Sequence, residues 1–246
     1  MAAQAETPMM KSDPAEFYTD GSYEHLNPDW DTADSVWKAG LVVSMLHRHH
    51  LRPASVTEVG CGAGAVLSAL RSPFPDARLH GWDIAHGVER FWQRQKGIEF
   101  TRGNFLSEAK EPVELLLLLD VIEHVANPHD FLTRLRPFGQ HLLLHIPLDL
   151  SAASVLRETP LLAQRRGVGH IHYFTRGLAL ELLSECGFKV IEATYTGAHL
   201  RQRSSLGGRL ASAVRRIVFW VNRDWGVRLL GGDTLVVLAR TGVHAP

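Results

Sequence analysis

A buried strand, a glycine-rich turn and the start of a helix follow one another in residues 56–70, Val-Thr-Glu-Val-Gly-Cys-Gly-Ala-Gly-Ala-Val-Leu-Ser-Ala-Leu. Glycines at alternate positions, Gly60, Gly62 and Gly64, let the chain turn sharply and leave no Cβ to block a ligand. The following helix directs its unpaired N–H groups and positive dipole end toward the same place. We therefore expect a ligand at this turn; a strand-turn-helix corner without one is the alternative.

Glu58 precedes the first of these glycines by two positions. The spacing Gly60-x-Gly62-x-x-Ala65 also satisfies the permissive dinucleotide pattern, so the glycines alone allow a nicotinamide or flavin cofactor. A carboxylate is badly placed beside a pyrophosphate, but it is well placed to accept hydrogen bonds from an ammonium group. Glu58 therefore favours a ligand that carries an ammonium.

An acidic residue followed by Gly-x-Gly-x-Gly resembles the first motif of the class I S-adenosylmethionine (SAM) methyltransferases. The resemblance implies that Glu58 faces the methionine end of the cofactor. It also implies that the backbone of the glycine turn, which includes Cys61, passes beneath that cofactor.

A second acid, Asp83, stands near the end of a predicted strand over residues 78–84. The distance from Gly60 is about what a helix and a neighbouring strand require. A carboxylate at this place can accept both ribose hydroxyl protons, in NAD sites and SAM sites alike. Asp83, with Ile84 beside it, is therefore a candidate cofactor residue, and capping of the helix through Glu89 and Arg90 is a compatible alternative.

Asn104 and Phe105 follow a predicted third strand over residues 98–104. At this position the methyltransferase family usually has an acidic residue near the adenine amino group. Asn104 departs from that pattern, although its carbonyl can accept from the same amine. Phe105 either lies against the adenine ring or belongs to the core.

Five consecutive leucines, residues 115–119, precede Asp-Val-Ile-Glu-His-Val at 120–125 and then Asn-Pro. The apolar run predicts a central strand covered on both faces. The polar sequence after it closely resembles the fourth motif of SAM methyltransferases that act on small molecules, and nicotinamide enzymes carry no such sequence. The resemblance implies that Asp120, with Val121, lies beside the cofactor's sulfonium region.

Two histidines are candidate catalytic residues, His124 in the fourth motif and His170 in the segment Gly-His-Ile-His-Tyr-Phe. An imidazole can remove a substrate proton near neutral pH, but each can equally fix its loop by hydrogen bonds. His170 and His172 alternate like strand residues, so at most one is expected to face a given site. No carboxylate cluster accompanies them in the sequence, and we expect no metal.

The predicted fold is α/β, a Rossmann-like seven-stranded, mostly parallel sheet with helices on both faces and an antiparallel last strand. Residues 1–34 are expected to form a disordered segment followed by an aromatic stretch that covers the site or anchors on the surface. The methyltransferase domain is predicted to span 35–246, with a helical insertion at about 197–233. Residues 206–223 read as a basic amphipathic helix, which either covers the pocket or contacts a membrane surface or lipid-linked acceptor.

Composition limits the remaining possibilities. Formal net charge is zero, and the base-amine motif of nucleic-acid methyltransferases is absent, which disfavours a nucleic-acid partner. Two cysteines, Cys61 and Cys186, indicate no disulfide framework. Neither a signal peptide nor a membrane-spanning run is recognised, so a cytoplasmic protein is expected. The oligomeric state is left open.

These patterns together predict a SAM-dependent methyltransferase. Its acceptor would be an oxygen, nitrogen or carbon nucleophile on a small molecule, possibly lipid- or glycan-linked. A SAM-binding protein without catalysis is the main alternative, and an NAD-dependent oxidoreductase fits the glycines and Asp83 but not Glu58 or the fourth motif.

Overall fold

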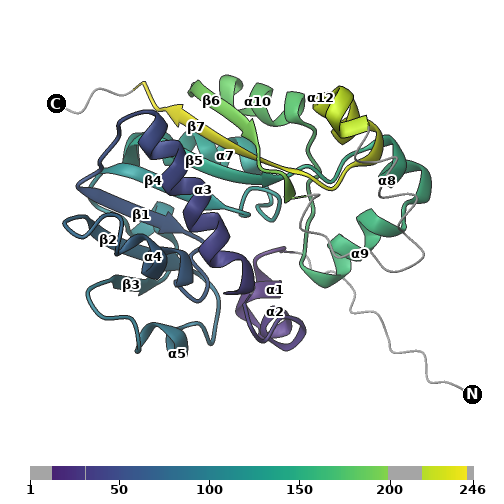
Figure 1. The fold of residues 1–246 in the computed structure, drawn as a ribbon. Coiled ribbons are helices and arrows are strands. Elements are labelled where there is room, and N and C mark those ends of the chain that lie inside the picture. Colours follow the sequence, from purple (N-terminus) through teal and green to yellow (C-terminus); the bar gives the residue numbers. More distant parts are fainter. Residues whose placement is uncertain (1–12, 31, 199–217, 243–246) are drawn as a thin grey trace, which may run out of the picture.

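The computed structural model describes residues 13–30, 32–198 and 218–242. Its centre is a seven-stranded sheet in the order β3-β2-β1-β4-β5-β7-β6 (Figure 1). The strands are β1 Ser55–Val59, β2 Arg78–Asp83, β3 Glu99–Arg102, β4 Val113–Leu119, β5 Gly139–Pro147, β6 Lys189–Tyr195 and β7 Thr234–Arg240. Strands β1 to β5 pair in parallel, whereas β7 runs antiparallel to both β5 and β6. The predicted fold class is confirmed.

Helices cover both faces of this sheet (Figure 1). They are α1 Glu16–Thr19, α2 Ser22–Leu26, α3 Ser35–Arg48, α4 Ala65–Leu70, α5 Glu89–Trp92, α6 Phe105–Glu108, α7 Pro128–Leu135, α8 Ala152–Arg157, α9 Thr159–Gly167, α10 Arg176–Glu185 and α12 Arg223–Leu230. Short 3-10 turns at Thr32–Asp34 and Arg136–Phe138 precede α3 and follow α7.

The leucine run in β4 shows why this strand is central. Leu115, Leu117 and Leu119 pack into the same cluster as buried residues of α3 and α4. Leu116 and Leu118 point to the opposite face, where buried residues of α7 and α10 meet them. Because side chains alternate along a strand, an unbroken apolar run is what a strand buried on both faces requires.

The sheet has a switch point between β1 and β4. From β1 the chain moves outward through β2 to β3, and it then returns to add β4 on the other side of β1. In open parallel sheets, ligands bind at the carboxyl ends of the strands beside such a point. Glu58 and Asp120 lie at this edge, in β1 and directly after β4.

Some predicted boundaries need correction. Residues 1–12 lie outside the described part of the chain, and the aromatic stretch that follows them forms two short helices, α1 and α2. Helix α5 begins at Glu89 with Val88 as its N-cap, so Asp83 does not cap it. The predicted amphipathic helix falls mostly on residues 199–217, also outside the described part, while 218–221 are helical and lead into α12. The domain boundary at residue 35 stays a prediction.

The long connection between β6 and β7 was expected to hold extra helix, and α12 lies within it. Thr175 caps α10, because its hydroxyl oxygen accepts from the backbone N–H of Leu178. Within the described ranges, no helix combines the length and apolar character needed to cross a membrane.

Candidate active site

A cavity of about 590 Å³ opens at the carboxyl edge of β1, β2 and β4. Its walls contain every candidate residue from the sequence except Gly64, namely Glu58, Gly60, Cys61, Gly62, Asp83, Ile84, Asn104, Phe105, Asp120, Val121, His124 and His170. The topology therefore gathers residues from five separate stretches of the chain around one space.

The glycines of the turn do different things. A Cβ on Gly60 would lie 2.7 Å from Val121 Cγ2, and one on Gly64 would lie 2.5 Å from the Phe100 ring. A Cβ on Gly62 would meet nothing closer than the Trp30 ring at 3.7 Å. Packing within the protein thus requires glycine at positions 60 and 64. Gly60 and Gly62 both line the cavity, but only Gly62 has room for a Cβ.

Glu58 is 2% exposed, and its Oε2 has no hydrogen-bond partner among the described residues. Burial raises the pKa of this carboxyl to about 8, even though the nearby Lys38 ammonium lowers it. A buried acceptor without a partner is costly, so an ammonium group from a ligand would compensate it. The methionine ammonium of SAM fits this requirement.

Asp83 is tied to the glycine turn. Its Oδ2 accepts from the backbone N–H of Gly62 at 2.7 Å, and its Oδ1 accepts from that of Ala85 at 2.8 Å. Burial raises its pKa, and these backbone bonds partly offset the shift. Each carboxylate oxygen keeps a second lone pair, so the predicted contact with ribose hydroxyls is compatible with both bonds.

Two side chains that can carry a positive charge contact Asp120, and no sequence motif links either of them to it. Lys38 Nζ lies 2.6 Å from Oδ2, and His145 Nδ1 lies 2.5 Å from Oδ1. Thr234 Oγ1 lies 2.7 Å from the other ring nitrogen of His145. Burial opposes ionisation, but His145 and Lys38 outweigh it and hold the pKa of Asp120 below its usual value. No sequence spacing signals this group, because its members come from α3, β5 and β7.

Asn104 and Phe105 line the cavity and also make contacts with neighbouring residues. Asn104 caps α6, and its Oδ1 accepts from the backbone N–H of Leu106 at 3.0 Å. Phe105 is 4% exposed and packs edge to face with Trp82 and Phe138. Phe105 therefore belongs to the core and borders the cavity at once, and contact of either residue with adenine stays a prediction.

The N-terminal aromatic stretch lies over the cavity. Tyr18, Tyr23 and Trp30 line it, and their rings pack in sequence, Tyr18 against Tyr23 and Tyr23 against Trp30. The Tyr18 hydroxyl donates to the carbonyl oxygen of Val168 at 3.0 Å and lies 2.7 Å from His124 Nδ1. The stretch thus connects the fourth motif to the segment before His170.

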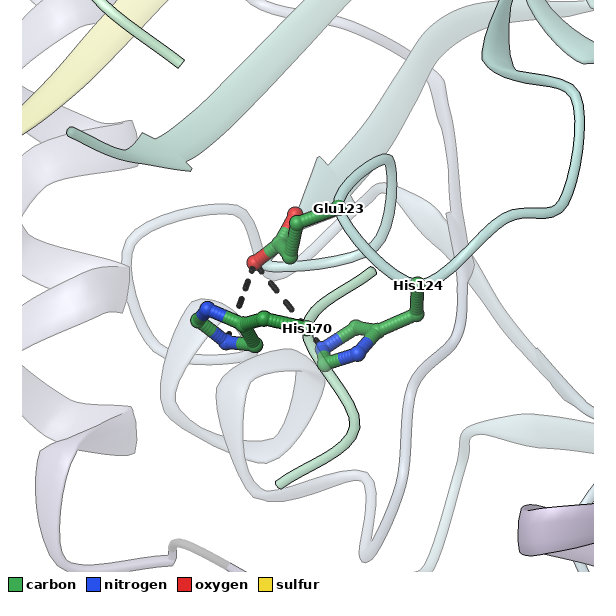
Figure 2. A group of neighbouring side chains, drawn as sticks. All are labelled: Glu123, His124 and His170. Carbon is green, nitrogen blue, oxygen red and sulfur yellow. Dashed lines mark ion pairs between the residues drawn. The ribbon is translucent and has the colours of Figure 1, made fainter. Parts of the chain in front are cut away.

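His124 and His170 lie together, with ring centroids 4.9 Å apart, and Glu123 lies beside both (Figure 2). His172 is directed elsewhere, toward the carbonyl oxygen of Ala126. The sequence shows no carboxylate cluster near the histidines, and the structure adds one carboxylate, that of Glu123. Glu123 adjoins His124 in the sequence, but only the fold brings His170 to the same place.

Comparison with known proteins identifies the family. The sequence model described as "Methyltransferase domain" matches residues 38–193. The chain belongs to this family of class I SAM-dependent methyltransferases. The match overturns the nicotinamide alternative, and SAM is the cofactor that the family uses.

Relatives agree with this assignment. The chain is similar to a ubiquinone biosynthesis O-methyltransferase of Ruegeria sp. (strain TM1040), 32% identical over 85 residues, which is 32% of this chain and 34% of that protein. The matched stretch thus spans about a third of that relative's length.

Two solved structures share the fold. The plantazolicin methyltransferase BpumL with bound S-adenosylhomocysteine (SAH) gives a TM-score of 0.60 at 13% identity, covering 92% of this chain and 93% of that one. Magnesium protoporphyrin IX methyltransferase of Synechocystis PCC 6803 with bound SAH gives 0.56 at 14% identity, covering 92% and 96%.

Replacing Gly62 with alanine tests whether the turn borders the cofactor. The positive φ at Gly62 makes an alanine cost about 1–2 kcal/mol of stability, and its Cβ would enter the space above the turn. We expect a folded variant with greatly weakened SAH binding by calorimetry. Gly60→Ala is the control, since its added clash with Val121 should lower the melting temperature further. Unchanged SAH affinity in Gly62→Ala would contradict the assignment.

The raised pKa of Glu58 predicts pH-dependent cofactor binding. An ammonium beside Glu58 favours the carboxylate, so binding lowers a pKa of about 8 and releases a proton at pH 7. SAH affinity should therefore rise with pH from 6 to about 8 and then level off. Calorimetry in buffers of different ionisation enthalpy measures the released proton. In Glu58→Gln the release should disappear; an equal release in both proteins would contradict the role of Glu58.

Proposed function

We propose that this enzyme methylates an oxygen of a small acceptor that carries an apolar, lipid-like part. The observation that supports the proposal is one cavity lined by two chemically different sets of residues. Glu58 and Asp83 suit the ammonium and ribose of SAM. His124 and His170 lie together, and their polar atoms can hold an acceptor hydroxyl.

Methyl transfer from a sulfonium depends mainly on in-line positioning and exclusion of water. The N-terminal aromatic residues supply the exclusion, because Tyr18, Tyr23 and Trp30 line the cavity and are packed with the core cluster that includes α3 and α4. The acceptor is expected between Tyr18 and His170. Its oxygen attacks the sulfonium methyl, the carbon–sulfur bond breaks, SAH leaves, and the hydroxyl proton passes to solvent.

Oxygen as the acceptor atom is supported by the name of the curated relative, an O-methyltransferase of ubiquinone biosynthesis. The lipid-like part is supported by an exposed apolar surface on three helical segments. Large apolar side chains stand exposed on α8, on residues 218–221 and on α12, namely Val155, Leu156, Trp220, Val221, Trp225 and Leu229. We call these residues the apolar face.

The apolar face is one surface because its elements pack together. Helices α8 and α12 are in contact and lie side by side (Figure 1). Phe219 is buried against Gly226, which holds residues 218–221 on α12 and leaves Trp220 86% exposed. Arg157 and Arg228 are exposed on the same two helices. Tryptophan with arginine is a composition that suits the boundary between lipid headgroups and acyl chains.

Methyl transfer can be tested directly. Purified enzyme with SAM is offered hydroxyaromatic compounds with and without an isoprenoid tail, together with matched amines. We expect SAH formation and a product heavier by one methylene unit at oxygen, fastest with the tailed compounds. Asp83→Asn should weaken SAH binding about 10–100-fold, the loss expected when hydrogen bonds to a charged group are impaired. Asp76→Asn, an exposed loop acid, is the matched control. SAH binding without turnover of any acceptor would favour a SAM-binding protein without catalysis.

Vesicle binding tests the lipid-like acceptor. The double variant Trp220→Ser, Trp225→Ser removes two exposed rings and should change folding stability by no more than about 0.5 kcal/mol. We expect the wild-type enzyme to co-sediment with anionic vesicles and the double variant to lose most of that binding. Val190→Ser, an exposed apolar residue on the edge strand β6, should bind like the wild type. Equal sedimentation of all three proteins would contradict the proposal of a lipid-like acceptor.

A further inference from the structure

Glu123 is a buried carboxylate that lacks hydrogen bonds within the described part of the chain. Its side chain is 0% exposed, and neither oxygen has a hydrogen-bond partner among the described residues. An isolated carboxylate in such a place is among the most costly groups a protein can bury, so a cation or proton must compensate it.

Two imidazole nitrogens face this carboxylate. His124 Nε2 lies 3.9 Å from Glu123 Oε1, and His170 Nε2 lies 4.0 Å from the same oxygen. One ligand atom from each of these three residues falls within 4.8 Å of the others. Figure 2 shows both rings directed toward the carboxylate from different segments of the chain. These separations are too long for hydrogen bonds but leave room for an ion between the groups.

The far nitrogen of each ring already has an acceptor. His124 Nδ1 lies 3.2 Å from the carbonyl oxygen of Gly169, which can only accept, so Nδ1 carries the proton. His170 Nδ1 lies 2.7 Å from Asp149 Oδ2 and donates to it. In a neutral imidazole protonated at Nδ1, Nε2 carries no proton and its lone pair can bind a cation.

The backbone fixes these groups relative to one another. The carbonyl oxygen of Glu123 accepts from the N–H groups of Ile171 and His172 at 2.9 and 3.0 Å. The segment that carries His170 is thus attached directly to the loop that carries Glu123 and His124. Tyr18 adds a third attachment through its bonds to Val168 and His124.

We propose that Glu123, His124 and His170 bind a divalent transition-metal ion such as Zn²⁺. Two imidazoles and one carboxylate form a typical zinc ligand set that leaves a position open. Bonds of about 2.0–2.2 Å need ligand atoms about 3.3–3.5 Å apart. Side-chain rotations that shorten separations of at most 4.8 Å to that range close the site. Asp149 completes the arrangement, because a carboxylate on the far nitrogen of a ligating histidine orients the ring and raises its basicity.

A protonated Glu123 is the competing explanation. It would remove the charge, but at 3.9 and 4.0 Å its proton reaches neither Nε2 atom, and two bare lone pairs would still face each other across the gap. A cation satisfies all three groups at once. The geometry therefore favours the ion.

This site deepens the proposed function and rests on it for its role. His124 and His170 line the cavity, so the open coordination position faces the place expected for the acceptor. An acceptor hydroxyl bound there loses its proton to solvent more readily, because the ion stabilises the oxyanion that attacks the sulfonium methyl.

Metal binding is measured on the full-length enzyme after treatment with a chelator and dialysis. Co²⁺ is followed by its visible absorption and Zn²⁺ by calorimetry, with neither SAM nor acceptor present. We expect one ion per chain and a cobalt spectrum of a site with mixed nitrogen and oxygen ligands. Glu123→Gln and His170→Gln should each abolish that spectrum, and Asp149→Asn should weaken affinity about 10–100-fold.

His172→Gln is the matched control, since this neighbouring histidine faces away from the site and should bind the ion as the wild type does. SAH binding by each variant shows that the fold persists. In the presence of chelator, Glu123→Gln should be at least as stable to heat as the wild type, because it removes a buried charge; Zn²⁺ should then stabilise only the wild type. Wild-type affinity in Glu123→Gln, or equal loss in His172→Gln, would overturn the proposal.

Failure of the two proposals can be told apart. A chain that binds SAH and methylates an oxygen but binds no ion at Glu123 refutes the metal site alone. A chain that binds the ion yet transfers no methyl group to any hydroxyl refutes the proposed acceptor and leaves the metal site standing.

Discussion

The concentration of carboxylates at one edge of a buried parallel sheet is the constraint on which this structure depends. Glu58 and Asp83 belong to β1 and β2, and Asp120 and Glu123 follow β4. Parallel strands deliver their carboxyl ends to the same edge, so acids that are far apart in the chain become neighbours. Each negative charge needs a partner in a place where water is scarce.

The protein meets this need in different ways. Backbone N–H groups of the glycine turn and of Ala85 hold Asp83. Lys38 and His145 hold Asp120. Glu58 and Glu123 keep oxygens without partners among the described residues, and these two acids are where ligands supply the compensation in our proposals. Asp83 and Asp120 are thus held by groups of the protein itself, whereas Glu58 and Glu123 are the acids that we propose to bind a ligand or an ion.

The N-terminal stretch and helix α3 complete a site that the sheet edge alone leaves open. Lys38 comes from α3, and Tyr18 from α1 joins His124 to Val168. The aromatic rings that follow cover the cavity with little polar surface of their own, which suits a reaction that proceeds best without water. Tyr18, Tyr23 and Trp30, which precede the matched family region, thus form part of the cavity wall.

The sequence by itself determined the fold class and the cofactor. Its glycine turn, its leucine strand and the acids that end strands are local patterns, and strand order follows from packing rules that hold for parallel sheets. Only the tertiary structure decided which distant residues meet. Lys38, His145 and Tyr18 carry no local signal, and the pairing of His170 with Glu123 depends on backbone bonds between segments far apart in the chain. Side chains that meet through long-range packing have no fixed spacing in a sequence, and for that reason the grouping around His124 could not be predicted from it.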